Sequence, residues 1–221
     1  MRLYHFTTEQ FGLVAIRDRR LKVARVMELN DPFEFLGPIF ADKSERQRMR
    51  EFKAEVDKDF GLICLSDNWS HPLLWGHYAD KHKGVCLGFD VLQPEDFDAV
   101  EYVEERPPMN QFGISAFSDL PEESIKRMLH LKFHAWSYEA EFRTFIDLKA
   151  TVYDEKSKLH FVPFRPTMKL AQVIMGWRSK STRTEVSKAL GWLKQDVEVF
   201  KSRPAFQEFE VVRNRDDALW E

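Results

Sequence analysis

The sequence is poor in the residues that build disulfide-linked proteins and cysteine-rich metal sites. It has two cysteines, Cys64 and Cys86, and they do not form a Cys-x-x-Cys pair. A disulfide scaffold and a cysteine-rich zinc site are therefore not indicated. Both cysteines lie in apolar stretches, which predicts buried and unreactive thiols.

Long apolar runs and a targeting segment are also missing. No stretch reaches the ~20 apolar residues that a membrane-spanning helix needs. The first ten residues, MRLYHFTTEQ, lack an apolar signal region. The sequence thus predicts no membrane contact and a cytoplasmic location.

Neither sign of charge dominates the chain. The 33 Lys and Arg residues nearly balance the 36 Asp and Glu residues, and the formal net charge is -3. A strongly basic nucleic-acid-binding protein is therefore not indicated, although nucleic acid stays possible as a partner. The stretch from Arg17 to Arg25 holds five basic residues and a single acid. It fits either a contact to phosphates or a solvated helix end.

Familiar glycine and histidine motifs are absent as well. The sequence contains neither GxGxxG nor GxxxxGK[ST], and it lacks the GxSxG turn of α/β-hydrolases. Metal binding by His71, His77, His82 and Asp80 is conceivable. However, no pair of these histidines has the HxxxH spacing that puts two ligands on one helix face, so we predict no metal site.

The composition is that of a globular protein. Of the 221 residues, 43% are hydrophobic and 14% aromatic, with 19 Phe. We predict a single domain over residues 1–221, of the α+β class, because short strands and helices follow one another irregularly. The stretches that read as strands are 3–6, 21–26, 61–66, 84–90, 99–105, 137–145, 170–177 and two short ones near 197–200 and 209–212. The stretches that read as helices are 8–17, 43–60, a short one with Ser70 as N-cap, 119–133, where Asp119 and Glu122 resemble a capping box, and one that starts at the pattern Thr182-x-x-Glu185.

The stretch SYEAEFRTF, residues 137–145, carries an unusual charge pattern for an aromatic-rich strand. Glu139, Glu141 and Arg143 recur at every second position, so on a strand they project to the same face. One interpretation is an exposed face with a salt bridge worth at most ~1 kcal/mol. The other is a site in which Arg143 positions a catalytic carboxylate.

Three further residues are candidates for a binding site. His5 lies at the end of a predicted strand, where it either hydrogen-bonds near the core or projects into a cleft. Tyr78 either packs against Leu74 or offers a flat ring to a planar ligand. Asn30 either makes a turn before Pro32 or forms the rim of a pocket.

Several motifs resemble a bacterial family catalogued as a domain of unknown function (DUF2971). They are LYHFTT, LNDPFEF, CLSDNWSHPLLWGHYADKHKGVCLGFD, WSYEAEFR and AQVIMGW, and they spread over most of the chain. The long middle block and NDPFE are the most specific of them. The family name implies no activity.

The order His, Tyr, Glu along the chain is similar to the ADP-ribosyltransferase superfamily. The early HFT motif supplies His5 and Thr7, Tyr78 stands in the middle, and Glu139-Ala140-Glu141 supplies the late glutamates. The resemblance implies mostly antiparallel strands in a split or bent sheet packed by helices, with NAD as a substrate.

The same resemblance implies roles for these residues. His5 would hydrogen-bond the adenosine side or a ribose of NAD, and Tyr78 would stack on nicotinamide. Glu141 would orient the nicotinamide ribose and offset positive charge at its anomeric carbon, while Glu139 could activate an acceptor. Arg143 could keep Glu141 ionised or contact the pyrophosphate.

Three hypotheses for the function follow from the sequence. The first is an ADP-ribosyltransferase-like enzyme that transfers ADP-ribose from NAD to a protein or nucleic-acid acceptor. The second is a non-enzymatic binding or regulatory module, for example in defence. The third is a phosphoester or glycosidic hydrolase that uses Glu139 or Glu141 with His77.

Overall fold

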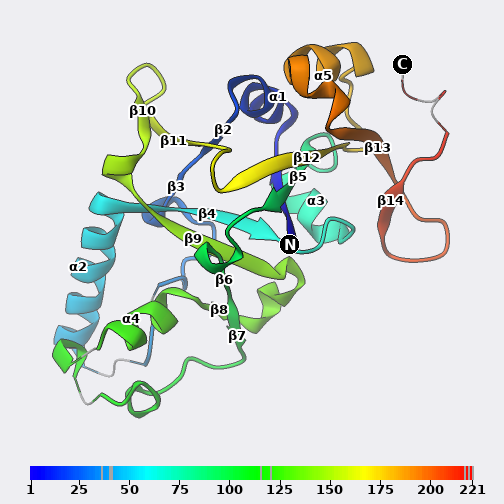
Figure 1. Cartoon of the computed structure of the whole chain (residues 1–221). Coiled ribbons are helices and arrows are strands. Elements are labelled where there is room, and N and C mark those ends of the chain that lie inside the picture. The colour runs from blue at the N-terminus through cyan, green and yellow to red at the C-terminus, as the bar shows by residue number, and fades with distance from the viewer. Residues whose placement is uncertain are drawn as a thin grey trace.

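The fold is given by a computed structural model of the chain (Figure 1). It describes residues 1–35, 37–39, 42–114, 116–119, 121–216, 218 and 220, except for the side chain of Phe117. In this part of the chain, no helix combines the length and the apolar character that crossing a bilayer requires.

The helices are short apart from one. The α-helices are α1 (Glu9–Asp18), α2 (Lys43–Asp59), α3 (Pro72–Tyr78), α4 (Glu122–Leu129) and α5 (Arg183–Leu190). The 3-10 helices are η1 (Val26–Glu28), η2 (Pro94–Asp96), η3 (Met109–Phe112), η4 (Phe117–Asp119), η5 (His134–Glu139), η6 (Leu148–Ala150) and η7 (Gly191–Gln195). Helix α5 begins with the capping box expected at Thr182 and Glu185, in which each side chain accepts a hydrogen bond from the other's backbone.

Most strands belong to one large, mostly antiparallel sheet. The strands are β1 (Arg2–Thr7), β2 (Arg20–Lys22), β3 (Ala24–Arg25), β4 (Phe60–Ser66), β5 (Val85–Val91), β6 (Asp98–Ala99), β7 (Glu101–Val103), β8 (Leu131–Phe133), β9 (Glu141–Asp147), β10 (Val152–Asp154), β11 (Leu159–Pro163), β12 (Met168–Met175), β13 (Glu198–Pro204) and β14 (Val211–Arg213). The large sheet has the order β14-β13-β12-β5-β1-β4-β9-β6, with β3 paired to β4. Within it, only β12 and β13, which α5 connects, run parallel. The predicted α+β class is confirmed.

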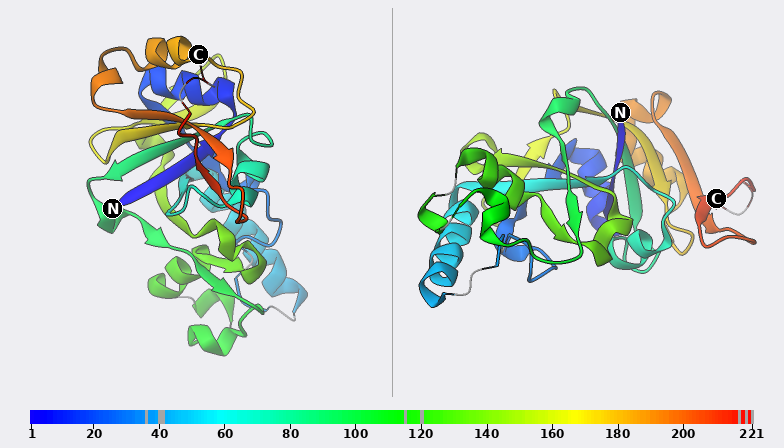
Figure 2. Two further views of the ribbon diagram at one scale, coloured as in Figure 1. Left: turned by 90° about the vertical axis from the view of Figure 1, so that its right-hand side faces the viewer. Right: turned by 90° about the horizontal axis from the view of Figure 1, so that it is seen from below.

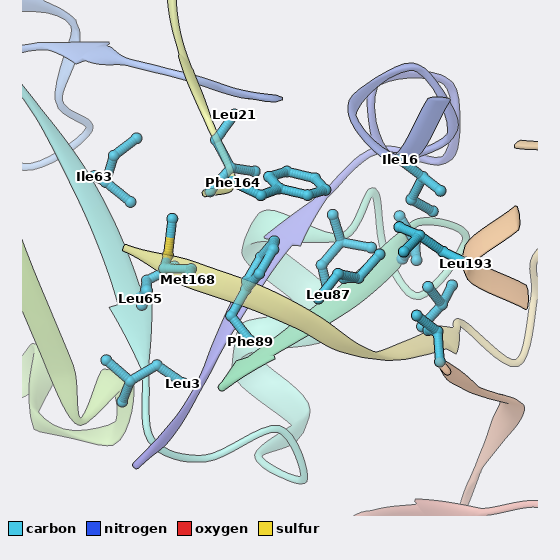
Figure 3. Packing of buried hydrophobic residues seen from close by; sticks show 14 of the residues in the cluster. Leu3, Ile16, Leu21, Ile63, Leu65, Leu87, Phe89, Phe164, Met168 and Leu193 are labelled. Carbon is cyan, nitrogen blue, oxygen red and sulfur yellow. The ribbon is translucent and has the colours of Figure 1, made fainter. Parts of the chain in front are cut away.

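Helices cover both faces of the sheet centre. Strand β5 is buried along nearly its whole length, and alternate residues of it serve opposite faces. On one face, Leu87 and Phe89 pack in a core with Ile16 of α1 and Leu193 of η7 (Figure 3). On the other face, Cys86 joins a separate cluster around α3. Helices α1 and α5 lie together over one end of the molecule, and α2 and α4 lie at the opposite end (Figures 1 and 2).

The large sheet is split between β1 and β4. Strand β1 pairs with β5 at six successive positions from Arg2 to Thr7, whereas it pairs with β4 only at Tyr4 and Ser66. Strand β4 is paired along its whole length with β9. Side chains at the ends of β1 and β4 therefore face a gap in the backbone hydrogen bonding rather than a continuous ladder.

Two predicted elements have different boundaries in the structure. The helix expected over 119–133 begins at Glu122, with Pro121 as its N-cap in place of the expected capping box, and Leu120 lies outside the described residues. The chain then leaves α4 and forms β8, which pairs in parallel with β7 and holds Lys132 on a strand.

The strand expected over 137–145 starts at Glu141. Glu139 ends the 3-10 helix η5, and Ala140, in the left-handed region with φ 42°, turns the chain into β9. Glu141 and Arg143 share a strand face as expected, while Glu139 reaches the same place from a turn.

A left-handed turn fixes the end of α3. Asp80, Lys81 and His82 all have positive φ, between 43° and 68°, a conformation that costs about 1–3 kcal/mol for each non-glycine residue. The backbone N–H of His82 donates to the Trp75 carbonyl at 3.1 Å, and the His82 ring stacks on that of Trp75. These contacts compensate the strain and lead the chain directly from α3 into β5.

Gly84, where the turn ends, should tolerate no side chain. A Cβ there would lie 2.2 Å from the Thr7 carbonyl oxygen and 2.9 Å from the Ala79 backbone. We expect Gly84→Ala to lower the free energy of unfolding by about 1–3 kcal/mol, as overpacking does, measured by urea denaturation. Gly76→Ala is the matched control, because a Cβ at Gly76 meets nothing within 4 Å. It should leave stability unchanged or raise it by up to ~1 kcal/mol, and an equal loss in both variants would contradict the prediction.

Candidate functional site

A cavity of about 260 Å³ opens where β1 and β4 diverge. Side chains from β1, β3, η1, β4, α3, β8, η5, β9 and the turn that follows η1 line it. The lining residues are Tyr4, His5, Phe6, Ala24, Glu28, Leu29, Asn30, Glu34, Cys64, Leu65, Ser66, Leu74, Tyr78, Lys132, Glu139 and Glu141. Most of the exposed surface of the wall is apolar, although many of the lining residues carry polar or charged groups. These polar groups are the ones that can orient a ligand.

His5 lies on the split edge of β1. Its Nδ1 lies 3.5 Å from the Cys64 carbonyl oxygen on β4. Since a carbonyl can only accept, this long contact is a hydrogen bond in the tautomer that carries the proton on Nδ1, and that tautomer leaves Nε2 as an acceptor. Burial lowers the pKa of His5, so the ring is neutral near pH 7.

The Tyr78 ring is held by hydrogen bonds at its hydroxyl. The hydroxyl donates to Oε1 of Glu139 and accepts from Nδ2 of Asn30, the latter at 2.8 Å. Burial and the neighbouring Glu139 carboxylate raise the pKa of Tyr78 well above its usual range, so the hydroxyl stays protonated. Three residues predicted separately from the sequence thus form one connected chain of contacts.

Five buried charges form a cluster at one side of the cavity. The ammonium of Lys132 lies 2.5 Å from Glu139, 2.9 Å from Glu141 and 2.9 Å from Glu34. Arg143 binds Glu141 with two parallel hydrogen bonds of 2.9 and 2.8 Å and also contacts Glu34 at 3.1 Å. Three carboxylates and two cations leave one negative charge in excess, which favours a cationic group in the cavity.

The two glutamates on either side of Ala140 differ in their titration. Burial alone would raise the pKa of Glu141, but Arg143 and Lys132 outweigh it and hold the pKa at about 2. For Glu139, burial dominates over Lys132 and raises the pKa above its ordinary value. Carboxylates whose pKa values are pushed apart in this way are suited to different chemical roles.

Free acceptor positions also distinguish the two carboxylates. A carboxylate offers about four lone-pair positions. On Glu141, Lys132 and Arg143 occupy three of them, and the thiol of Cys64, a weak donor, hydrogen-bonds the same carboxylate. On Glu139, Tyr78 and Lys132 occupy two. Glu139 therefore keeps open positions for a ligand hydroxyl, whereas Glu141 offers mainly its charge.

The depressed pKa of Glu141 predicts how the free energy of unfolding changes at acid pH. A carboxyl whose pKa falls on folding contributes stability above its unfolded pKa of about 4.5, and this stability is lost as the pH falls through about 2. We expect a loss on the order of 3 kcal/mol in the free energy of unfolding over this window. Urea denaturation at a series of pH values should show a smaller loss for Glu141→Gln, which lacks the titrating group. Parallel pH profiles for the two proteins would contradict it.

Not every predicted site residue lies at the cavity. Thr7 is not among its lining residues, and its methyl group faces Gly12 of α1. Arg143 has 0% of its side chain exposed, so its guanidinium binds carboxylates instead of a ligand pyrophosphate. His77 is exposed on α3, where its ring stacks on Tyr138.

Lys132 and Glu34 are site residues that the sequence did not indicate. Lys132 falls in the stretch 119–133 that was predicted as a helix, and its neighbours in the chain carry no sign that it is buried. Glu34 lies in the NDPFEF motif, where the Asp31 side chain accepts from the Phe33 N–H at 2.8 Å. This turn directs Glu34 inward.

Four of the five basic residues from Arg17 to Arg25 are paired with acids within the fold. Arg17 pairs with Asp18, Arg20 with Asp154, Lys22 with Glu28 and Arg25 with Asp57, while Arg19 donates to the Ile16 and Leu190 carbonyls. Among the described residues, no group of three or more His, Cys, Asp or Glu residues is placed to hold a metal ion.

Comparison with known proteins finds a similarity to one family, whose description names no activity. Residues 74–144 match the family model described as "Protein of unknown function (DUF2971)", which confirms the family resemblance predicted from the sequence. The matched segment includes Tyr78, Lys132 and the Glu139 to Arg143 stretch. No curated protein and no solved structure matches the chain.

Proposed function

We propose that the cavity binds NAD as a substrate and that the protein transfers ADP-ribose from it to an acceptor. The observation that carries the proposal is the convergence of His5, Tyr78, Glu139 and Glu141 on one cavity. These residues come from three separate segments, namely β1, α3 and the stretch from Glu139 to Glu141. The meeting of the three segments therefore follows from the fold and not from proximity in the chain. A pocket that gathers perturbed titratable groups in a largely apolar wall is a functional-site candidate.

The size of the cavity suits part of the dinucleotide. Its volume of about 260 Å³ is slightly below the ~300 Å³ at which ligand pockets begin. We expect it to hold nicotinamide and the adjacent ribose, with the remainder of NAD outside. In this arrangement the Tyr78 ring lies against the nicotinamide, and Nε2 of His5 accepts a hydrogen bond from a hydroxyl of NAD.

The chemical step breaks one bond and forms another. The bond between the ribose C1′ and the nicotinamide nitrogen breaks, and nicotinamide leaves with the electron pair. The ribose then carries positive charge, which the ionised Glu141 stabilises because its field is weakly screened in an apolar pocket. Arg143 takes part only through Glu141, as a positioning residue that keeps this carboxylate charged and fixed.

Glu139 is placed to handle the acceptor. A nucleophile that attacks C1′ must lose a proton as the new bond forms, and Glu139 retains open acceptor positions to receive it. Its raised pKa makes it a better base than Glu141. Its hydrogen bond from Tyr78 orients the carboxylate between the two walls of the cavity.

An ADP-ribosyltransferase-like fold is part of the proposal. The split between β1 and β4, where only Tyr4 and Ser66 pair, supports the split sheet that the resemblance implies. The cavity is lined from both sides of this split.

Hydrolysis of a glycosidic bond is the second candidate, because the same glutamate pair could act on a water molecule. The version of this hypothesis that uses His77 has no support, since His77 lies outside the cavity. No observation at the site specifically favours a phosphoester hydrolase or a non-enzymatic binding module.

Incubation with NAD labelled in the adenine separates transfer of ADP-ribose from hydrolysis of NAD. A labelled acceptor indicates transfer, and free ADP-ribose alone indicates hydrolysis. Absence of nicotinamide release, with and without cell lysate, would overturn both.

Two substitutions of Tyr78 should separate its ring from its hydroxyl. Tyr78→Ala removes the ring and is expected to raise KM for NAD about 2- to 10-fold, the range of a lost aromatic contact. Tyr78→Phe keeps the ring, so KM should stay near that of the unsubstituted protein while transfer slows, because Glu139 loses its hydrogen bond. Steady-state nicotinamide release measures both, and equal KM values in the two variants would contradict stacking.

A further inference from the structure

The hairpin of β13 and β14 lies at the end of the sheet away from β9 (Figures 1 and 2), and large aromatic side chains are exposed on and beside it. Phe206 and Phe209, in the loop between the two strands, are 88% and 98% exposed. Trp177, which follows β12, is 44% exposed. Trp177 and Phe206 both line a groove of about 530 Å³ beside the hairpin.

The groove is positively charged. Lys201, Arg203 and Arg215 line it, against the single acid Asp216. The Arg203 guanidinium lies 4.4 Å from the centre of the Phe206 ring, so a cation and an aromatic face are presented together. The Lys201 ammonium donates to the Ser179 carbonyl at 3.0 Å, an acceptor that is not a carboxylate.

A buried hydroxyl at the groove has no partner. Ser202 lies between Lys201 and Arg203, is 1% exposed and lines the groove. Its Oγ makes no hydrogen bond with any described residue. An unsatisfied buried hydroxyl costs about 1–3 kcal/mol. Because successive strand residues point to opposite faces, the Ser202 side chain lies on the buried face of β13, away from Lys201 and Arg203, and it is not among the groups that would contact a ligand.

We propose that this groove binds single-stranded nucleic acid. Proteins that hold single strands combine cations along the phosphates with aromatic rings on which bases stack, and the groove supplies both. The formal net charge of -3 does not oppose this, because electrostatic attraction follows the local potential. The proposal does not depend on the function of the cavity between β1 and β4.

Fluorescence anisotropy with labelled oligo(dT) and oligo(rU) tests the proposal. We expect binding that weakens with salt. Phe206→Ala should weaken it about 5- to 100-fold, the range of one lost stacking contact. Removing Arg203 and Arg215 together should make the slope of log K against log salt shallower by about 1.4, or ~0.7 for each lost phosphate contact.

Matched controls come from exposed residues elsewhere in the chain. Phe11→Ala, on α1, and Lys158→Ala, between β10 and β11, should bind the oligonucleotides as the unsubstituted protein does. Tyr78→Ala should do so as well, which separates this proposal from the function of the cavity. No binding up to about 100 μM protein, the weak end of non-specific nucleic-acid affinity, would overturn the proposal. Binding to phosphatidylserine vesicles but not to oligonucleotides would overturn the proposal in favour of a membrane surface. Unchanged oligonucleotide affinity in the Phe206, Arg203 and Arg215 variants would overturn it as well.

Discussion

Glu141→Gln should lower the rate of nicotinamide release by about 100- to 1,000-fold, with folding retained. The substitution keeps the shape of the side chain and removes its charge, and losing one preorganised electrostatic contact to a transition state typically costs that much. Glu141 is 5% exposed and holds a pKa of about 2, so near pH 7 its charge is complete and water screens it little. The decrease should appear in kcat more than in KM.

Glu34→Gln is the control for damage to the ion-pair cluster. Glu34 contacts the same two cations, Lys132 and Arg143, as Glu141 does. A glutamine at either position therefore disturbs similar ion pairs, but only Glu141 has a role at the reacting ribose in our proposal. Equal losses of activity in the two variants would contradict that role, and a retained rate in Glu141→Gln would remove Glu141 from the mechanism.

Arg143→Met should lower the free energy of unfolding by about 3–5 kcal/mol. The guanidinium is completely buried and binds two carboxylates, Glu141 and Glu34. Removing one partner of a buried ion pair leaves the other charges without compensation, which accounts for a loss of that size. Urea denaturation of both proteins measures it.

Arg127→Met is the matched control for Arg143→Met. Arg127 also makes two hydrogen bonds to one glutamate, Glu101, at 2.8 and 2.7 Å. That pair is exposed, with 37% and 43% of the two side chains accessible, so its loss should cost at most ~1 kcal/mol. Comparable losses in the two variants would show that burial does not set the strength of these pairs. Arg143→Met combined with Glu141→Met should recover part of the loss, because both members of the pair are then apolar.

Local sequence patterns predicted the regular elements well. Period-two and helical patterns located β1, α1, α2, β4 and β5, and the Thr182 and Glu185 pair located the start of α5. These features depend on neighbours a few residues apart, which a single sequence displays. The pattern failed near Glu139 and Lys132, where tertiary contacts decide. The alternation of Glu139, Glu141 and Arg143 indicates a strand, yet Ala140 breaks it with a left-handed turn.

The sequence indicated several residues of the candidate site, but it did not indicate which buried charges pair with one another. Resemblance singled out His5, Tyr78 and Glu141, and the structure places all three on one cavity. The pairing of Arg143 with Glu34, which lies 109 positions away in the chain, has no local signal. The partners of a buried charge follow from the order of strands in the sheet, which no spacing rule specifies.

The shortness of α3 has a consequence for heat sensitivity. A seven-residue helix is unstable in isolation, because the free-energy cost of forming its first turn exceeds the stabilisation that two turns of hydrogen bonds provide. Tertiary anchors must therefore order it, chiefly the buried indole of Trp75 and the left-handed turn after Tyr78. Local opening that releases this segment needs less free energy than melting the sheet. Amide hydrogen exchange should accordingly be faster in α3 than in β5, and warming should abolish ligand binding before the protein unfolds as a whole.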